Sequence, residues 1–167
     1  MRALFHKIRS TGRVAEPAPQ RPDEKPGTTP NNDKQDDVLR GSVQVRHVDA
    51  GSCNGCEIEI GSAFGPVYDG ERYGARLVAS PRHADVLLVT GPVTKNMAEP
   101  LRKAYDATPA PKRVVAVGDC AHNCGVFTGG YGVEGAVADV IPVDVVVRGC
   151  PPEPPRIIEA LRDLTGR

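Results

Sequence analysis

Five short runs of residues, bounded by Gly, Pro or polar residues, constrain the fold of this chain more than any other feature. Four are rich in Val and Leu, and the first alternates apolar and polar residues as a half-buried strand does. Such runs suit a parallel sheet, because its strands are covered on both faces. We expect these strands at Ser42–Asp49, Ala75–Ala79, Val86–Thr90, Val114–Val117 and Val143–Val147.

Helical patterns separate these runs. We expect helices over about Cys56–Phe64, Thr94–Thr108 and Pro154–Leu164. The last has apolar residues at helical spacing, a Pro at its start and Gly166 just past its end. Strands that alternate with helices predict a compact α/β domain with a parallel sheet. A chain of 167 residues favours one such domain, here over residues 38–167.

The N-terminal part of the chain differs from the rest. Residues 14–37 hold five Pro among polar residues, which predicts a linker that contributes nothing to the core. Residues 1–13 carry four basic residues and no acid, and Leu4, Phe5 and Ile8 fit one face of a short helix. We expect either a basic amphipathic segment or a basic tail without fixed structure.

Composition excludes several classes of protein. A formal net charge of zero and 4% aromatic residues argue against a nucleic-acid partner. No run approaches the roughly 20 apolar residues that cross a bilayer, and the N-terminus lacks the apolar region of a secretory signal. We therefore expect a cytoplasmic chain. Five cysteines in such a chain favour metal or redox chemistry over disulfides.

Four cysteines follow three of the predicted strands. Cys53 and Cys56 form a CxxC pair after the first strand, and Cys120 and Cys150 follow the last two. The carboxyl ends of parallel strands form the ligand crevice of open α/β sheets, so these three loops can converge on one site. Their Gly and Pro residues permit close backbone approach to a ligand. Four thiolates there would hold an iron–sulfur cluster or zinc, and scattered core thiols are the remaining alternative.

Three segments around these cysteines carry a family resemblance. VDAGSCNGCEIEI, GDCAHNCGVF and PVDVVVRGCPPEPPRI resemble the small electron-transfer subunit of membrane-bound nickel–iron hydrogenases, of the formate hydrogenlyase type. Its superfamily includes the 20 kDa, B-type subunit of NADH–quinone oxidoreductase. The resemblance spans about residues 38–164. It implies a flavodoxin-like α/β domain whose loops at the strand carboxyl ends bind one 4Fe–4S cluster through Cys53, Cys56, Cys120 and Cys150.

The same resemblance implies a non-catalytic electron-transfer subunit of an oxidoreductase complex on the cytoplasmic face of the membrane. Its partners would be a hydrogenase-like catalytic large subunit, a ferredoxin-like iron–sulfur subunit and membrane subunits docked through residues 1–13. The respiratory branch has adjacent cysteines at the first motif, whereas CNGCE is the hydrogenase form. A quinone-reducing B-type subunit of an NADH–quinone oxidoreductase-like complex is the alternative. A zinc-stabilised interaction module is a third reading.

Several other residues near the cysteines or in Gly-rich segments have an expected role. Glu57 and Glu59 could take up protons coupled to reduction, or simply favour the start of a helix. Cys124 is expected to pack, because many relatives carry Gly there. His47 has no ligand spacing and is expected to be an ordinary histidine. The glycines of FTGGYGVEG match no nucleotide-binding pattern, so we expect no flavin or NAD site and predict an interface loop there.

Overall fold

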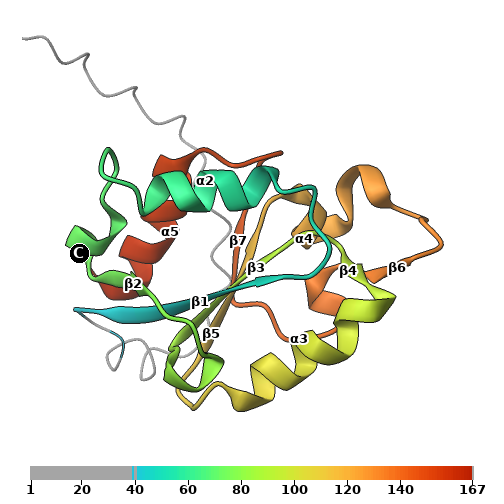
Figure 1. Cartoon of the computed structure of the whole chain (residues 1–167), viewed down its shortest axis with the longest axis horizontal. Coiled ribbons are helices and arrows are strands. Elements are labelled where there is room, and N and C mark those ends of the chain that lie inside the picture. Colours follow the sequence, from blue (N-terminus) through green and yellow to red (C-terminus); the bar gives the residue numbers. More distant parts are fainter. Residues whose placement is uncertain (1–38, 40, 167) are drawn as a thin grey trace, which may run out of the picture.

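A five-stranded parallel sheet organises the part of the chain that the computed structural model describes, Leu39 and residues 41–166. Its strands lie in the order β2-β1-β3-β5-β7 (Figure 1). Numbered along the chain within this sheet, that order is 2-1-3-4-5, which is the flavodoxin-like arrangement. The predicted flavodoxin-like α/β fold is confirmed. The N-terminal segment 1–13 and the linker 14–37 lie outside the described residues.

The expected strands and helices all form, with small differences at their ends. The strands are β1 (Val43–Asp49), β2 (Ala75–Leu77), β3 (Val86–Thr90), β4 (Val93–Thr94), β5 (Arg113–Val117), β6 (Val133–Gly135) and β7 (Val145–Val147). The α-helices are α2 (Gly55–Ala63), α3 (Lys95–Ala107), α4 (Asp119–Asn123) and α5 (Pro154–Thr165). Single 3-10 turns form at η1 (Gly70–Tyr73), η2 (Pro81–His83), η3 (Gly125–Phe127) and η4 (Val137–Asp139).

Besides the 3-10 turns, three short elements were not predicted. Strands β4 and β6 pair antiparallel away from the main sheet. Helix α4 has five residues and lies between Gly118 and Cys124, which both have a positive φ. These elements are too short to show a hydrophobic period, so only contacts with distant segments reveal them.

Helices cover both faces of the sheet. Successive residues of β3 point to opposite faces, so Leu88 packs with α2 and α5 while Leu87 packs with α3 and α4. Figure 1 shows α2 and α5 on one side of the sheet and α3 on the other. All five residues of β3 are buried, which explains why its sequence is a continuous apolar run that ends in one polar residue, Thr90. Among the described residues, no helix is long and apolar enough to cross a membrane.

The strands end together at one edge of the sheet. Asp49 of β1 lies opposite Thr90 of β3, and Thr90 lies opposite Val117 of β5. Val117 in turn lies opposite Val147, the last residue of β7. The segments that follow β1, β5 and β7 therefore leave the sheet at the same edge, and these are the segments that carry the four cysteines.

The opposite end of the sheet is held together by carboxylates. Asp85 accepts a hydrogen bond from the backbone N–H of Gln44 at 2.8 Å. Asp144 accepts one from the N–H of Val114 at 2.8 Å and forms an ion pair with buried Arg113 at 3.0 Å. Neighbouring strands are thus joined at their amino ends by side chains as well as by the sheet itself.

Candidate functional site

The turn between β1 and α2 carries the first two cysteines. Asp49 accepts two backbone N–H groups of this turn, each at 2.8 Å. Asn54 has a left-handed backbone, and its N–H donates to Ser52 Oγ at 3.0 Å. These bonds leave Cys53 exposed in the turn and place Cys56 in the first turn of α2, where it is buried.

The other two cysteine loops are bonded to each other. The N–H of Asp119 donates to the carbonyl of Gly149 at 2.9 Å. In return, the N–H of Gly149 donates to Asp119 Oδ1 at 3.1 Å. Cys120 follows Asp119 and is buried, whereas Cys150 follows Gly149 and is exposed. The reciprocal bonds keep these two loops at a constant separation.

Close packing also brings the first loop against the other two. Gly118 has φ +93, and a Cβ there would lie 2.7 Å from the Sγ of Cys56, which no real contact tolerates. Only Gly lets the backbone after β5 approach this thiol. A Cβ on Gly55 would lie 3.6 Å from Cys53 Sγ and 3.7 Å from the Cγ of Pro151. All three cysteine-bearing segments therefore meet at the carboxyl edge.

The four thiols in these loops interact electrostatically. Burial raises the pKa of Cys56 to about 12, and charge on Glu57, Cys120, Cys53 and Cys150 adds to the effect. Burial also raises the pKa of Cys120, followed by charge on Cys150 and Cys53. None of these cysteines forms a disulfide. The protein thus brings together thiols that disfavour one another's ionised form.

Cys124 stands apart from this group although it follows Cys120 by only four residues. Its pKa is raised by burial and then by charge on Asp139, and the other cysteines do not contribute. It occupies a left-handed position at the end of α4.

Within residues 41–166, no three His, Cys, Asp or Glu side chains are grouped closely enough to hold a single metal ion.

The two glutamates after the CxxC pair have different surroundings. Glu57 accepts a hydrogen bond from Ser52 Oγ at 2.5 Å and another from the hydroxyl of Thr90, and its side chain is 17% exposed. Glu59 is half-buried, and in the described part of the chain it has no hydrogen bond or ion pair. Glu57 and Glu59 therefore have different environments, although both follow the CxxC pair and the sequence suggests the same roles for them.

His47 and Thr90 extend the surroundings of Glu57. His47 Nε2 lies 2.9 Å from Thr90 Oγ1 and 3.5 Å from Glu57 Oε1. Burial lowers the pKa of His47, and the nearby charges on Glu57 and Asp49 act in the opposite direction. The sequence analysis assigned no role to Ser52 or Thr90. The available signal for Thr90 was its position as the polar end of an apolar strand.

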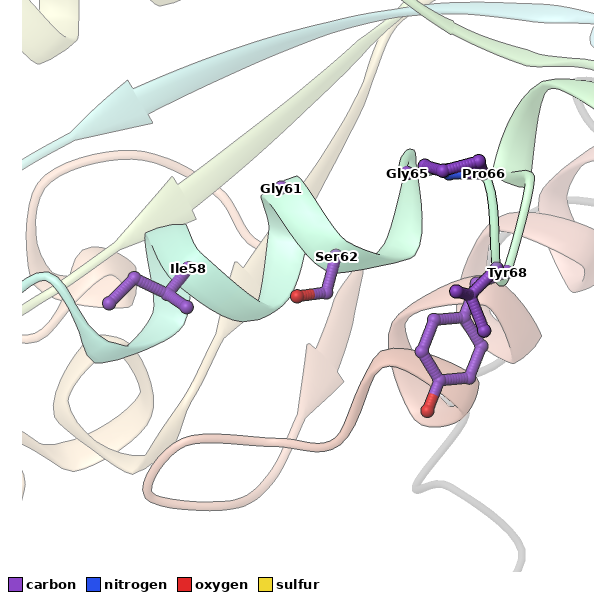
Figure 2. A pocket seen from close by; sticks show the side chains of 7 residues that line it. Ile58, Gly61, Ser62, Gly65, Pro66 and Tyr68 are labelled. Atoms are coloured by element: carbon purple, nitrogen blue, oxygen red, sulfur yellow. The ribbon is translucent and has the colours of Figure 1, made fainter.

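A groove runs along the outer face of α2. It has a volume of about 450 Å³ and begins at Ile58, two residues after Cys56. Figure 2 shows Ile58 and Ser62 on the helix and Tyr68 on the segment that follows. The lining residues are Ile58, Gly61, Ser62, Gly65, Pro66, Val67 and Tyr68. This mostly apolar surface is formed by α2, which also carries Cys56, and by the segment that follows the helix.

Comparison with known proteins identifies the family of this chain. Residues 53–164 match the family described as NADH ubiquinone oxidoreductase, 20 Kd subunit. A probable membrane-bound hydrogenase subunit of Pyrococcus furiosus is 50% identical over 120 residues, which cover 72% of this chain and 72% of that protein. Formate hydrogenlyase subunit 7 of Escherichia coli is 46% identical over 116 residues, covering 70% of this chain and 46% of that protein.

A solved structure provides a further match. One chain of a membrane-bound sulfane sulfur reductase, an archaeal respiratory membrane complex, aligns with a TM-score of 0.67 and 32% identity. The alignment covers 77% of this chain and 71% of that chain.

Proposed function

Because this chain belongs to the family of the NADH ubiquinone oxidoreductase 20 kDa subunit, we propose that it is an electron-transfer subunit of a membrane-associated, hydrogenase-like complex. It would carry one 4Fe–4S cluster and relay electrons between a ferredoxin-like subunit and a catalytic large subunit. The observation that carries the proposal is the meeting of three cysteine-bearing loops at one sheet edge, with thiols that shift one another's pKa.

The residues at this edge fit such a cluster. Cys53, Cys56, Cys120 and Cys150 are unpaired thiols of the type that bind iron in these clusters. Burial, followed by charge on neighbouring groups, raises the pKa of Cys56 and Cys120, so positive charge from bound iron would favour the ionised form of these two thiols. When bound, the cluster supplies one-electron redox chemistry. The chain's own contribution is to hold the thiols and bury Cys56 and Cys120, since burial tunes the potential of such centres.

Exposed apolar side chains near the cysteine edge support a partner subunit there. Gly125 lies against Cys120, since a Cβ on it would be 3.1 Å from that Sγ. The next residue, Val126, is 83% exposed, and Tyr131 in the same loop is 96% exposed. A protein partner that covers this loop would remove apolar surface from water and also shield the thiols. Relatives named as hydrogenase subunits make a hydrogenase-like large subunit the candidate.

The groove on α2 favours a second candidate, a quinone-reducing subunit of a respiratory-type complex. Ile58 on α2, the helix that carries Cys56, and Pro66, Val67 and Tyr68 in the segment after it offer an apolar surface. An apolar ring bound there would lie on the helix that holds one thiol of the proposed cluster. The family description, which names ubiquinone, agrees with this candidate.

Co-expression tests the proposal. We expect the chain, purified without oxygen together with its large subunit, to contain about four iron and four sulfide per chain and a reduced-state paramagnetic resonance signal. Zinc without iron or sulfide would contradict the proposal and support an interaction module. Reduction of the signal-bearing centre by hydrogen supports a hydrogenase partner, whereas its oxidation by a soluble quinone, lost on Ile58→Asp, supports the second candidate.

We also propose that residues 1–13 attach the domain of residues 38–167 to membrane subunits through Leu4, Phe5 and Ile8, with 14–37 as the linker. The support is the sequence pattern of basic and apolar residues. Deletion of residues 1–37 should leave the iron content unchanged and shift the complex from the membrane to the soluble fraction. Unchanged membrane attachment in high salt would contradict this role.

A further inference from the structure

Glu57 connects three elements of the carboxyl edge through hydroxyl groups. It belongs to α2 and accepts hydrogen bonds from Ser52, in the turn before Cys53, and from Thr90, at the end of β3. Ser52 Oγ also accepts the N–H of Asn54 at 3.0 Å. Through Ser52, the Glu57 carboxylate supports the turn from residue 52 to residue 54, whose backbone also bonds Asp49.

The direction of each bond follows from the chemistry of the groups. A carboxylate only accepts, so both hydroxyls donate to Glu57. Thr90 Oγ1 is then free to accept, and the ring N–H of His47, 2.9 Å away at Nε2, is the donor that fits. Donation runs from His47 to Thr90 to Glu57. Each hydrogen bond in this series therefore has one donor and one acceptor.

We propose that Glu57 is a positioning residue, which clamps the turn bearing Cys53 to the carboxyl end of β3 through the hydroxyls of Ser52 and Thr90. In this role the carboxylate acts on the cysteine site through the backbone of the turn. The role rests on the proposed function only for the identity of the group that the thiols bind.

The position of β3 explains why the clamp is needed. This strand lies between β1 and β5 in the sheet, and both neighbours lead into cysteine-bearing loops while β3 does not (Figure 1). Its last residue, Thr90, is fully buried and so offers a fixed anchor. The turn itself is exposed at Cys53. The Glu57 bonds thus join an exposed turn to the most buried strand of the sheet.

The charge and the partial burial of the Glu57 carboxylate strengthen its hydrogen bonds. Hydrogen bonds to an ionised acceptor are roughly twice as strong as neutral ones. The Glu57 side chain is only 17% exposed, so water competes weakly for its oxygens. Outer residues of this kind, which orient the ligands of a metal centre, typically change its retention by about 10-fold to 100-fold when replaced.

The test compares variants in the full chain, co-expressed without oxygen with its large subunit. We expect Glu57→Gln and Ser52→Ala to release iron to a chelator about 10-fold to 100-fold faster than the unaltered protein. Ser52→Thr, which keeps the hydroxyl, should restore slow release. Glu59→Gln removes the same charge two residues away, where no clamp exists, and should leave the release rate unchanged.

The redox potential separates the clamp from a simple effect of charge. Glu57→Gln removes a negative charge beside Cys56 and should raise the midpoint potential of the centre, whereas Ser52→Ala keeps that charge and should leave the potential nearly unchanged. Fast release in both variants with a shifted potential in only one supports the clamp. Equal release rates for Ser52→Ala and Ser52→Thr would overturn it.

Hydrogen exchange in the metal-free chain gives an independent measurement. The backbone amides of residues 51–54 should exchange faster in Ser52→Ala than in Ser52→Thr, whatever group the thiols bind. Iron-free protein after anaerobic co-expression would overturn the proposed function. The difference in hydrogen exchange between Ser52→Ala and Ser52→Thr would still show whether the clamp exists. Equal exchange in the two variants would overturn the clamp and leave the proposed function standing.

Discussion

Carboxylates bond backbone N–H groups at both ends of the sheet, but only the carboxyl ends also bring together a group of thiols. At the amino ends, Asp85 and Asp144 bond the backbone of neighbouring strands, and Asp144 also neutralises buried Arg113. At the carboxyl ends, Cys56 and Cys120 are buried as thiols with raised pKa values. The first end completes its interactions within the chain. The second brings together groups whose favourable partner would be a bound cation or cluster.

This difference separates stability from binding. Among the described residues, no buried side-chain nitrogen or oxygen lacks a hydrogen-bond partner, so the fold itself is internally satisfied. Thiols are weak hydrogen-bond donors and tolerate burial without such partners. The chain can therefore keep a group of thiols ready at one end while the other end holds the strands together. The predictions below test that division.

Replacing a cysteine of the carboxyl edge should have the largest effect. Cys120→Ala should abolish bound iron, because an iron loses a thiolate that no neighbour replaces. Cys124→Ala is the matched control: both thiols are buried, but only Cys120 responds electrostatically to Cys53 and Cys150. Iron and sulfide analysis after anaerobic purification measures the outcome. Full iron content in Cys120→Ala would contradict the ligand assignment.

Removing a carboxylate at the amino ends should reduce stability without affecting binding. Asp144→Ala leaves buried Arg113 without this ion pair, which is partly exposed on the Asp144 side, and should lower the free energy of unfolding by about 2–3 kcal/mol. The iron content per folded molecule should not change. Urea unfolding measures the first quantity, with Glu99→Ala as a control, since Glu99 pairs with Lys103 on the open surface and its loss should matter little.

Replacing each of two glycines by Ala should distinguish backbone strain from a direct steric effect on the cysteine site. Gly118 and Gly41 have φ values of +93 and +99, which side chains rarely adopt, so Ala at either position should cost about 1–3 kcal/mol of stability. Only at Gly118 would the new Cβ press on Cys56 Sγ, whereas Gly41 faces open space. Gly118→Ala should therefore also lose iron. Equal iron content in the two variants would show that the close approach is unimportant.

The smallest expected effect is a pH dependence at the carboxyl ends. Burial lowers the pKa of His47, so folding favours its neutral form. This contribution to stability is present above the unfolded pKa of about 6.5 and is lost as the pH falls below it, by at most about 1.4 kcal/mol per pH unit. His47→Gln should flatten the dependence seen in urea unfolding of the metal-free chain. Exposed His83 serves as the control position, and His83→Gln should leave the dependence in place.

Much of the fold could be predicted because its signals are local. The apolar run at Val86–Thr90 forms β3 with the expected bounds. The first and last residues of strands and helices were predicted less accurately, because contacts with distant residues determine where these elements begin and end. For example, β5 begins at Arg113 rather than Val114 because the N–H of Arg113 donates to the carbonyl of Asp85, 28 residues earlier, at 2.9 Å. Such a bond leaves no trace in the local pattern.

The sequence by itself determined the five strands of the main sheet, the longer helices, the family and the candidate cysteines, because hydrophobic period and motif spacing are properties of consecutive residues. The tertiary structure alone decided which polar residues meet. Ser52 and Thr90 reach Glu57 across 5 and 33 positions of the chain, and the pKa of Cys124 is raised by burial and by charge on Asp139 but not by charge on its neighbour Cys120. The pairing of Thr90 with Glu57 arises from the parallel order of the strands, which brings the ends of distant segments to one edge.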